Sequence, residues 1–250
     1  MIGLIEPERG AAVQAEVPQA KGNTGLVGGA ISAITAHIRD GELSPGDKLP
    51  SESVFARDLA VSRTVVREAF RSLAAMRLIE VSTGKRATVA KLDHTAISPL
   101  IEHGVSTEQI SILQVYDVRR TIETRTATLA ALHRTGAQSR EIAALAETMQ
   151  NSFLDPAAMM EADIGFHLAI ARAAKNPIYP LIVGAFEGVT RQTWPVGWKS
   201  RSSESEQHHM LDIHSDLASA IAAGNPEQAA ELMALHFDAS VRALLAAGIS

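Results

Sequence analysis

The stretch from Gly41 to Ala69, GELSPGDKLPSESVFARDLAVSRTVVREA, decides the fold of the first part of the chain. Ser51 and Ser62 each precede a short run of apolar residues at helical spacing. A serine hydroxyl at the start of a helix accepts a hydrogen bond from a first-turn amide. The sequence therefore predicts two short helices joined by a turn. The apolar stripe of the second helix consists of Val65, Val66, Ala69, Phe70 and Leu73.

The second of these helices carries arginines near its start. Arg63 and Arg67 are four residues apart, so they share one face of the helix. A guanidinium group pairs with guanine O6 and N7 through two hydrogen bonds. Two short helices, the second with basic residues near its start, are typical of a helix-turn-helix that reads the major groove of DNA.

The segment from Gly41 to Val89 resembles the winged helix-turn-helix of the GntR family of bacterial transcription regulators. The matching residues are Leu49-Pro50-Ser51-Glu52, Ser62-Arg63-Thr64, Val66-Arg67-Glu68-Ala69 and Gly84. The resemblance implies DNA contacts by Arg57, Ser62, Arg63, Thr64, Arg67, Gly84 and Lys85. Many family members carry an arginine directly after the Leu-Pro-Ser-Glu element, where this chain has Ser53. We therefore expect its operator sequence or affinity to differ from theirs.

A helix and a hairpin are predicted on either side of the helix-turn-helix. Apolar residues recur at helical spacing over residues 25–40, and Gly41 ends that run. After the second short helix, residues 78–81 and 86–89 are rich in β-forming side chains, with Gly84 in the turn between them. This pattern predicts a β-hairpin, the wing.

The formal net charge of −5 is unevenly distributed along the chain. Residues 57–91 hold eight Lys and Arg against three Asp and Glu, a local net of +5, whereas residues 92–250 hold 11 basic and 18 acidic side chains, a net of −7. Salt screens exposed charges over about 8 Å, so a DNA phosphate senses the local charge and not the total. The pattern indicates a basic DNA-binding part joined to an acidic part.

Composition excludes several protein classes. The chain is 46% apolar, which is enough for a packed core, and it has no uninterrupted apolar run of about 18 residues that would suggest a membrane span. It contains no cysteine, so neither disulfides nor thiolate metal sites are available. The N-terminal residues lack a basic region followed by an apolar one. We expect a cytoplasmic protein without a membrane partner.

The expected fold class is mainly α, with two domains. Residues 1–24 lack sustained periodicity and are expected to form a flexible tail. We assign residues 25–91 to the winged helix-turn-helix, residues 92–105, which contain Pro99 and Gly104, to a linker, and residues 106–250 to an antiparallel bundle of about six helices. Breaks in the helical pattern are expected at Gly136, Asp155-Pro156, Asn176-Pro177, Pro195 to Gly197 and Gly224-Asn225-Pro226.

One carboxylate and three histidines stand out in the predicted bundle. Asp163 and His167 are four apart on one helix, and His214 and His236 lie on two later helices. Helical bundles build metal sites from side chains of facing helices, and these ligand types suit Zn²⁺, Ni²⁺, Mn²⁺ or Fe²⁺. The alternative is an ordinary hydrogen bond within one helix and isolated core histidines.

Residues 106–250 resemble the FCD ligand-sensing domain of the FadR subfamily of GntR regulators. The matches are Asp163, Phe166-His167, Ala173-Ala174-Lys175-Asn176, His214 and His236. In metal-binding members such residues hold a divalent cation. The resemblance therefore implies one divalent metal ion per chain, with zinc expected first and nickel, manganese or iron as alternatives.

Two arginines are candidates for effector binding. Arg119 matches a family arginine that approaches a bound carboxylate; the alternative is a surface arginine paired with Glu123, one helical turn later. Arg191, with Trp194 and Trp198, is expected at the mouth of the ligand pocket. These three residues could equally belong to the core or to an interface.

The sequence thus leads to a homodimeric transcription regulator and not to an enzyme. We expect a repressor of an organic-acid or sugar-acid catabolic operon that reads a palindromic operator in double-stranded DNA and is released by a small carboxylate. The alternatives are a metal-dependent enzyme on a helical bundle and a purely metal-responsive regulator. The identity of the effector stays open.

Overall fold

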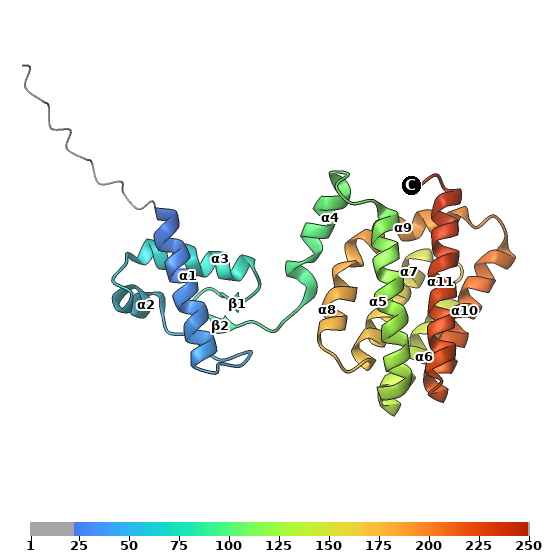
Figure 1. The fold of residues 1–250 in the computed structure, drawn as a ribbon, viewed down its shortest axis with the longest axis horizontal. Helices are drawn as coiled ribbons and strands as arrows, with labels where there is room; N and C mark the ends of the chain where they lie inside the picture. The colour runs from blue at the N-terminus through green and yellow to red at the C-terminus, as the bar shows by residue number, and fades with distance from the viewer. Residues whose placement is uncertain (1–22, 250) are drawn as a thin grey trace, which may run out of the picture. The chain divides into compact units, whose positions relative to one another are not determined.

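The computed structural model describes residues 23–249, which form two compact units that divide between Ala90 and Lys91. Each unit has its own hydrophobic core and is considered by itself (Figure 1). The tail expected over residues 1–24 lies outside the described residues, except that Asn23 and Thr24 already belong to the first helix.

The first unit is a winged helix-turn-helix, as the sequence predicts. Its elements are α1 (Asn23–Asp40), α2 (Glu52–Asp58), α3 (Arg63–Ala75), β1 (Ile79–Glu80) and β2 (Thr88–Val89). Both predicted N-caps are present: the Ser51 hydroxyl accepts a hydrogen bond from the Val54 amide at 3.4 Å, and the Ser62 hydroxyl accepts one from the Val65 amide at 3.3 Å. The apolar stripe of α3 is buried against α1 and α2.

The wing is a short antiparallel hairpin. Ile79 pairs with Val89 and Glu80 pairs with Thr88, so each strand is two residues shorter than the predicted segment. Gly84, in the connecting turn, has φ of +73°, a left-handed conformation that a side chain would disfavour. Ile79 and Ala87 are buried in the core of this unit, and Val89 packs against it.

The segment over residues 92–105, which we expected to be a linker, is mostly helical. This segment contains η1 (His94–Ala96) and most of α4 (Ser98–Ser106), and both pack on the second unit. Pro99 lies in the first turn of α4, where a missing amide hydrogen costs no helical hydrogen bond. Gly104 is buried against Ile110, where an added Cβ would lie 2.6 Å from the Ile110 side chain. The two residues that look like breakers are therefore compatible with a packed helix.

The remainder of the second unit is an antiparallel bundle. Its helices are α5 (Ile112–His133), α6 (Gly136–Asn151), α7 (Pro156–Ala173), α8 (Ile178–Ala185), α9 (Glu187–Ser200), α10 (Glu204–Ala223) and α11 (Pro226–Ala246). Within the described residues this makes seven helices where about six are expected. The expected break from Pro195 to Gly197 is wrong, because α9 continues through it; the chain turns at Phe186 instead.

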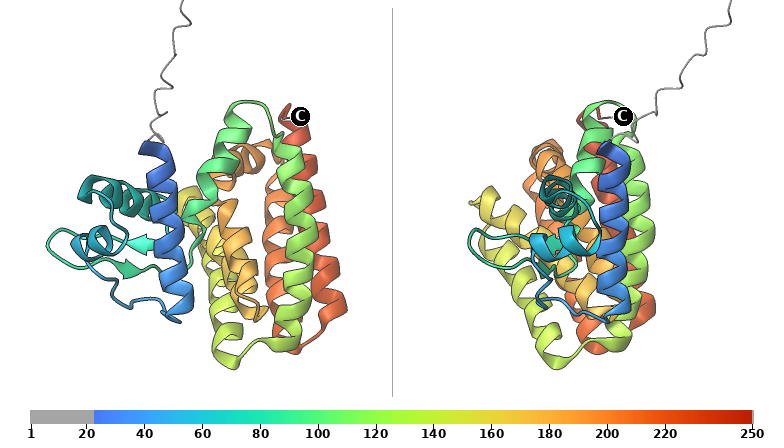
Figure 2. Two further views of the ribbon diagram at one scale, coloured as in Figure 1. Left: turned by 60° about the vertical axis from the view of Figure 1, so that its left-hand side comes forward. Right: turned by 90° about the vertical axis from the view of Figure 1, so that its left-hand side faces the viewer.

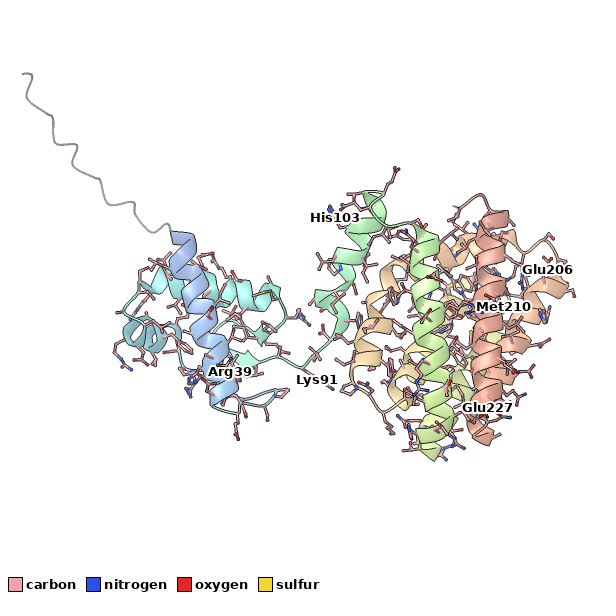
Figure 3. All side chains as sticks on the ribbon, viewed as in Figure 1. Arg39, Lys91, His103, Glu206, Met210 and Glu227 are labelled. Atoms are coloured by element: carbon pink, nitrogen blue, oxygen red, sulfur yellow. The ribbon has the colours of Figure 1, made fainter. Side chains whose placement is uncertain are left out.

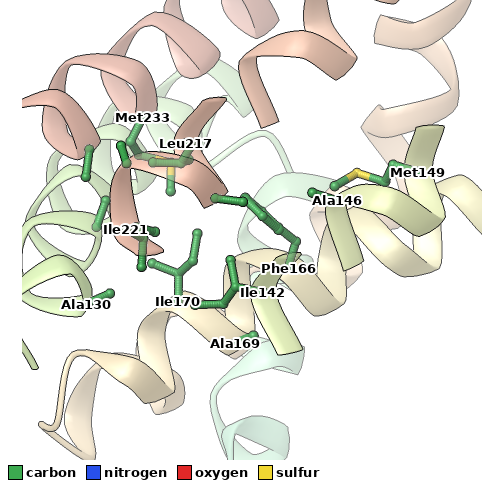
Figure 4. Close-up of a cluster of buried hydrophobic side chains, with 14 of the residues drawn as sticks. Ala130, Ile142, Ala146, Met149, Phe166, Ala169, Ile170, Leu217, Ile221 and Met233 are labelled. Carbon is green, nitrogen blue, oxygen red and sulfur yellow. The ribbon is translucent and has the colours of Figure 1, made fainter. Parts of the chain in front are cut away.

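The bundle core lies between α5, α6, α7, α10 and α11. α5 and α11 run side by side (Figures 1 and 2), and α6 packs against both α7 and α10. Figure 4 shows Phe166 and Ile170 of α7 directed toward Leu217 and Ile221 of α10. None of the helices in residues 23–249 combines the length and the apolar character that crossing a bilayer requires.

Candidate metal centre and nucleic-acid interface

Four side chains that can bind a metal meet inside the bundle. Asp163 and His167 come from α7, His214 from α10 and His236 from α11. All four are buried, and one candidate ligand atom from each lies within 4.8 Å of the others. The structure thus brings together the four residues that sequence analysis selects.

Neighbouring apolar residues explain why these helices direct polar side chains inward. Phe166 and Ile170 anchor the inner face of α7, the face that also carries Asp163 and His167. On α10 and α11 the histidines likewise lie among residues that are fully buried in the same core, namely Leu211, Leu217, Met233 and Phe237. Helical periodicity therefore fixes the position of each ligand.

The contacts of His214 require positive charge, either on its ring or between the ring and Asp163. Its Nδ1 lies 2.8 Å from the carbonyl oxygen of Met210 (labelled in Figure 3), so this nitrogen carries a hydrogen. Its Nε2 lies 2.9 Å from Oδ1 of Asp163, which is also an acceptor. A neutral ring would direct a lone pair at a carboxylate. The contact is favourable only if Nε2 carries a proton or if a cation lies between the two groups.

His167 has a partner that sequence analysis did not assign. Nδ1 of His167 lies 2.5 Å from Oε2 of Glu123, a contact whose angle falls outside hydrogen-bond geometry. Nε2 of His167 lies 3.9 Å from Oδ1 of Asp163 and has no hydrogen-bond partner among the described residues. This nitrogen is therefore available as a ligand.

The protonation preferences of the cluster fit a divalent cation. Burial lowers the pKa of His236 well below 6.5, and the nearby His214 and His167 lower it further, so His236 is neutral as a metal ligand must be. Burial alone would raise the pKa of Asp163, but the hydrogen bond from His214 and the charges of the histidines outweigh it and keep the carboxyl ionised. One carboxylate and three imidazoles are a donor set that zinc accepts.

A small cavity opens beside this cluster. Its volume is about 40 Å³, enough for about three water molecules. Polar residues that line it include Arg119, Asp163, Thr190, Arg201, His214 and His236, and Trp194 and Trp198 form an aromatic wall. The two indole rings are stacked with centroids 5.5 Å apart.

Arg119 lies inside the bundle, with only 5% of its surface exposed. Its Nε donates to Glu123 at 2.8 Å, and its Nη1 donates to the Thr190 hydroxyl at 2.8 Å. The guanidinium also lies over the rings of Tyr116 and Phe237. The predicted alternative, a surface arginine paired with Glu123, is correct in the partner and wrong in the location.

Arg201 lines the cavity, and the expected Arg191 does not. Arg191 does not line the cavity; it pairs with Glu187, one turn earlier on α9, and with Glu161 of α7. Arg201, at the end of α9, does line it, and its Nη1 donates to the Gly197 carbonyl at 2.8 Å. The Glu187–Arg191 spacing of four residues was the available signal for the surface ion pair.

In the first unit, the proposed DNA-contacting residues lie on α2, α3 and the wing. Arg63, Thr64 and Arg67 are exposed on α3, whereas the Ser62 hydroxyl is used as its cap. A surface hollow with a volume of about 450 Å³ is lined by Ser53, Arg63, Gly84, Lys85 and Arg86, among others. It therefore joins the start of α3 to the wing turn.

Two flanking contacts modify this surface. Arg57, on α2, forms an exposed ion pair with Asp58 at 2.9 Å, which leaves its guanidinium accessible to solvent. The Ser53 hydroxyl, at the position where the family resemblance led us to expect an arginine, lies 2.9 Å from the Ser51 hydroxyl. At this position the chain thus presents a small uncharged group.

Comparison with known proteins identifies both units. Residues 27–89 match the family "Bacterial regulatory proteins, gntR family", and residues 114–239, half of the chain, match the FCD domain family. The structure is also similar to that of Streptococcus agalactiae GntR, with a TM-score of 0.64 at 24% identity, covering 86% of this chain and 98% of that one. At 24% identity this structural similarity establishes the fold alone.

Two relatives are similar in sequence over most of their length. The HTH-type transcriptional regulator LutR of Bacillus subtilis is 31% identical over 206 residues, 80% of this chain and 92% of the relative. The galactonate operon transcriptional repressor of Escherichia coli is 31% identical over 197 residues, 76% of this chain and 84% of the relative. Both matches are longer than either unit, so each extends over parts of both.

Proposed function

The chain belongs to the GntR family of bacterial regulatory proteins, and on that premise we propose that it is a repressor that a small carboxylate releases from DNA. Its family and relatives are transcription regulators, so the alternative of a metal-dependent enzyme is set aside. Such a regulator acts where the chromosome lies, and the cytoplasm is the proposed compartment.

The proposed DNA interface is the exposed start of α3 together with the wing. Arg63 and Arg67 would read bases in the major groove, assisted by Ser62 and Thr64. The backbone contacts would come from Arg57, Gly84 and Lys85. One winged helix offers few base contacts, so we propose a homodimer that reads a palindromic operator.

The proposed metal site consists of Asp163, His167, His214 and His236. When bound, a divalent ion, with zinc as the first expectation, would supply positive charge and a coordination position for an oxygen of the effector. The chain itself supplies a closed, largely apolar surround, in which electrostatic interactions are stronger than in water.

The proposed effector is a compact carboxylate held by Arg119. This arginine lines the same cavity as three of the four metal-site residues, and Thr190 and Glu123 fix its guanidinium. Arg201 adds a second guanidinium at the cavity and takes the place we expected for Arg191. The galactonate operon named for one relative makes galactonate one of the acids to test.

The observation that carries this proposal is the contact between His214 and Asp163. The contact requires positive charge inside the bundle, which a protonated His214 or a bound cation can supply, and it lies on the cavity that the buried Arg119 also lines. A metal and an arginine together form a site that attracts a carboxylate and discriminates against neutral ligands.

The test is release of operator DNA. Labelled DNA from upstream of the gene is bound to zinc-loaded or chelator-stripped protein and titrated with lactate, galactonate and other small acids. The proposal predicts that at least one acid weakens DNA binding tenfold or more with zinc-loaded protein and much less with stripped protein. If zinc alone changes DNA affinity and no acid adds to it, the purely metal-responsive alternative replaces this proposal.

A further inference from the structure

Glu123 is a buried acid that the sequence assigns only as a possible partner of Arg119. It lies on α5 with none of its surface exposed. Its Oε1 accepts a hydrogen bond from Nε of Arg119 at 2.8 Å, and its Oε2 lies 2.5 Å from Nδ1 of His167. One carboxylate therefore touches both the candidate effector arginine and a candidate metal ligand.

The chemistry of the two neighbours requires a carboxylate between them. The Nε of an arginine is always a donor, so Oε1 must be an acceptor. The angle between Nδ1 of His167 and Oε2 falls outside hydrogen-bond geometry, but a lone pair on Nδ1 would repel a carboxylate oxygen 2.5 Å away, so the hydrogen of the neutral ring is favoured on Nδ1. Only a carboxylate offers an acceptor to each side; the amide of glutamine would offer one acceptor and one donor.

This requirement determines which nitrogen of His167 can bind a metal. With the hydrogen on Nδ1, the lone pair of the neutral ring is on Nε2. Nε2 is the nitrogen that lies on the side of Asp163, 3.9 Å from its Oδ1, without a hydrogen-bond partner in residues 23–249. We propose that Glu123 is a positioning residue that holds His167 in its metal-binding tautomer and, through its other oxygen, orients Arg119 toward the effector.

The consequence is a physical connection between the two halves of the proposed site. A change at Glu123 would alter the metal ligand and the effector arginine together, although Glu123 does not line the cavity. Carboxylates that receive the second nitrogen of a metal-bound histidine typically affect metal affinity by 10–100-fold, an order-of-magnitude expectation. This inference rests on the proposed function, because it presupposes a metal at His167.

Zinc affinity of isosteric variants is the direct test. Zinc dissociation constants of wild type and Glu123→Gln are measured by competition with a chromophoric chelator, with folding checked by circular dichroism. We expect Glu123→Gln to bind zinc about 10-fold to 100-fold more weakly. Glu141→Gln, which breaks the exposed ion pair with Arg172, is the matched control and should bind as wild type does.

A double variant separates positioning from general damage to the core. In Glu123→Gln the single amide oxygen cannot serve both donors. In Arg119→Leu/Glu123→Gln the arginine donor is gone, so the amide oxygen is free to accept from Nδ1 of His167. We therefore expect the double variant to recover zinc affinity to within about threefold of wild type, because the contact that orients His167 is restored. Glu123→Gln binding within twofold of wild type, or a double variant as weak as the single one, overturns the proposal.

The tautomer itself can be observed without metal. Nitrogen NMR of the histidine rings in stripped wild-type protein, at alkaline pH where imidazoles are neutral, should show His167 with its hydrogen on Nδ1. A hydrogen on Nε2 contradicts the role of Glu123 even if zinc binds. Failure of the wild type to bind zinc would instead contradict the proposed metal site, and the tautomer would still decide the inference about Glu123.

Discussion

Nε2 of His214 lies 2.9 Å from Oδ1 of Asp163, while the other nitrogen of the same ring is held by a backbone carbonyl. Both groups are buried, and a buried carboxylate needs compensating charge. A metal ion satisfies this requirement for Asp163 and for all three histidines at once. The predictions below follow from this arrangement and from the exposed arginines of α3.

Arg63 and Arg67 are predicted to read bases. Replacing either by alanine should weaken operator binding by about 1–3 kcal/mol and relax the base preference at the contacted position. Arg71→Ala is the control, because Arg71 lies farther along α3 and is paired with Glu68. Binding to single-base operator variants is compared by fluorescence anisotropy. If the discrimination between bases is unchanged, these arginines are not the readers.

Lys85 is predicted to contact phosphate. Lys85→Ala should weaken all DNA sequences by about the same factor and reduce the slope of log affinity against log salt by about 1. Lys199→Ala makes the same charge change on an exposed residue of the other unit and should leave the slope as it is. A loss confined to the operator would instead mean that the wing turn reads sequence.

Local features of the first unit were predictable from sequence, since they depend on neighbours in the chain. The Ser62 cap, the start of α3 and the glycine turn of the wing all follow from residues within one turn of each other. The expectation of a linker over residues 92–105 used the same local reasoning and missed the helix there. Pro99 and Gly104 look like breakers locally, and only the packing of α4 shows that both are accommodated.

The candidate metal centre was predictable only in part. Asp163 and His214 are 51 residues apart, and their convergence was expected from the family resemblance, not from periodicity. Glu123 and Arg201 were missed as site residues because their roles depend on which helices face each other. The Glu187–Arg191 spacing indicates the surface ion pair of Arg191, but no local pattern indicates that Arg201 lines the cavity.

Arg119 is predicted to bind the effector. Arg119→Lys keeps a positive charge beside Glu123, and so avoids an unpaired buried carboxylate, but loses the two-pronged hydrogen bonding of the guanidinium. The effector should bind about tenfold more weakly, since a hydrogen bond to a charged group contributes roughly 1.5–3 kcal/mol. Calorimetry with the acid found active in DNA release provides the measurement.

Arg120→Lys is the matched control for this variant, because Arg120 is the next residue and forms an exposed pair with Asp238. DNA affinity without effector should be the same in wild type and both variants. An Arg119→Lys protein that still releases DNA at the wild-type concentration of acid would place the effector elsewhere.

His236 is predicted to make the metal-free protein sensitive to acid. Its pKa is lowered well below 6.5 in the folded state, chiefly by burial, so below about pH 6.5 the unfolded chain binds a proton that the folded chain does not. The free energy of unfolding should therefore decrease as pH falls from about 6.5 toward 5, by up to about 1.4 kcal/mol per pH unit from this group.

Urea unfolding of stripped protein between pH 8 and 5 measures this effect. His236→Gln should have a shallower pH dependence than wild type, and the exposed His133→Gln should match wild type. Equal slopes for wild type and His236→Gln would show that His236 is not buried in its neutral form.

The measurement that tests the central claim most directly is the metal content of the protein. Protein purified without chelator and analysed by plasma mass spectrometry should contain close to one divalent ion per chain, and the His214→Ala/His236→Ala variant should contain almost none. Stripping the ion should also lower the melting temperature, and adding zinc back should restore it, because the ion binds the folded state. Wild-type protein that is folded but metal-free, and that cannot be reloaded with zinc, nickel, manganese or iron, would contradict the account.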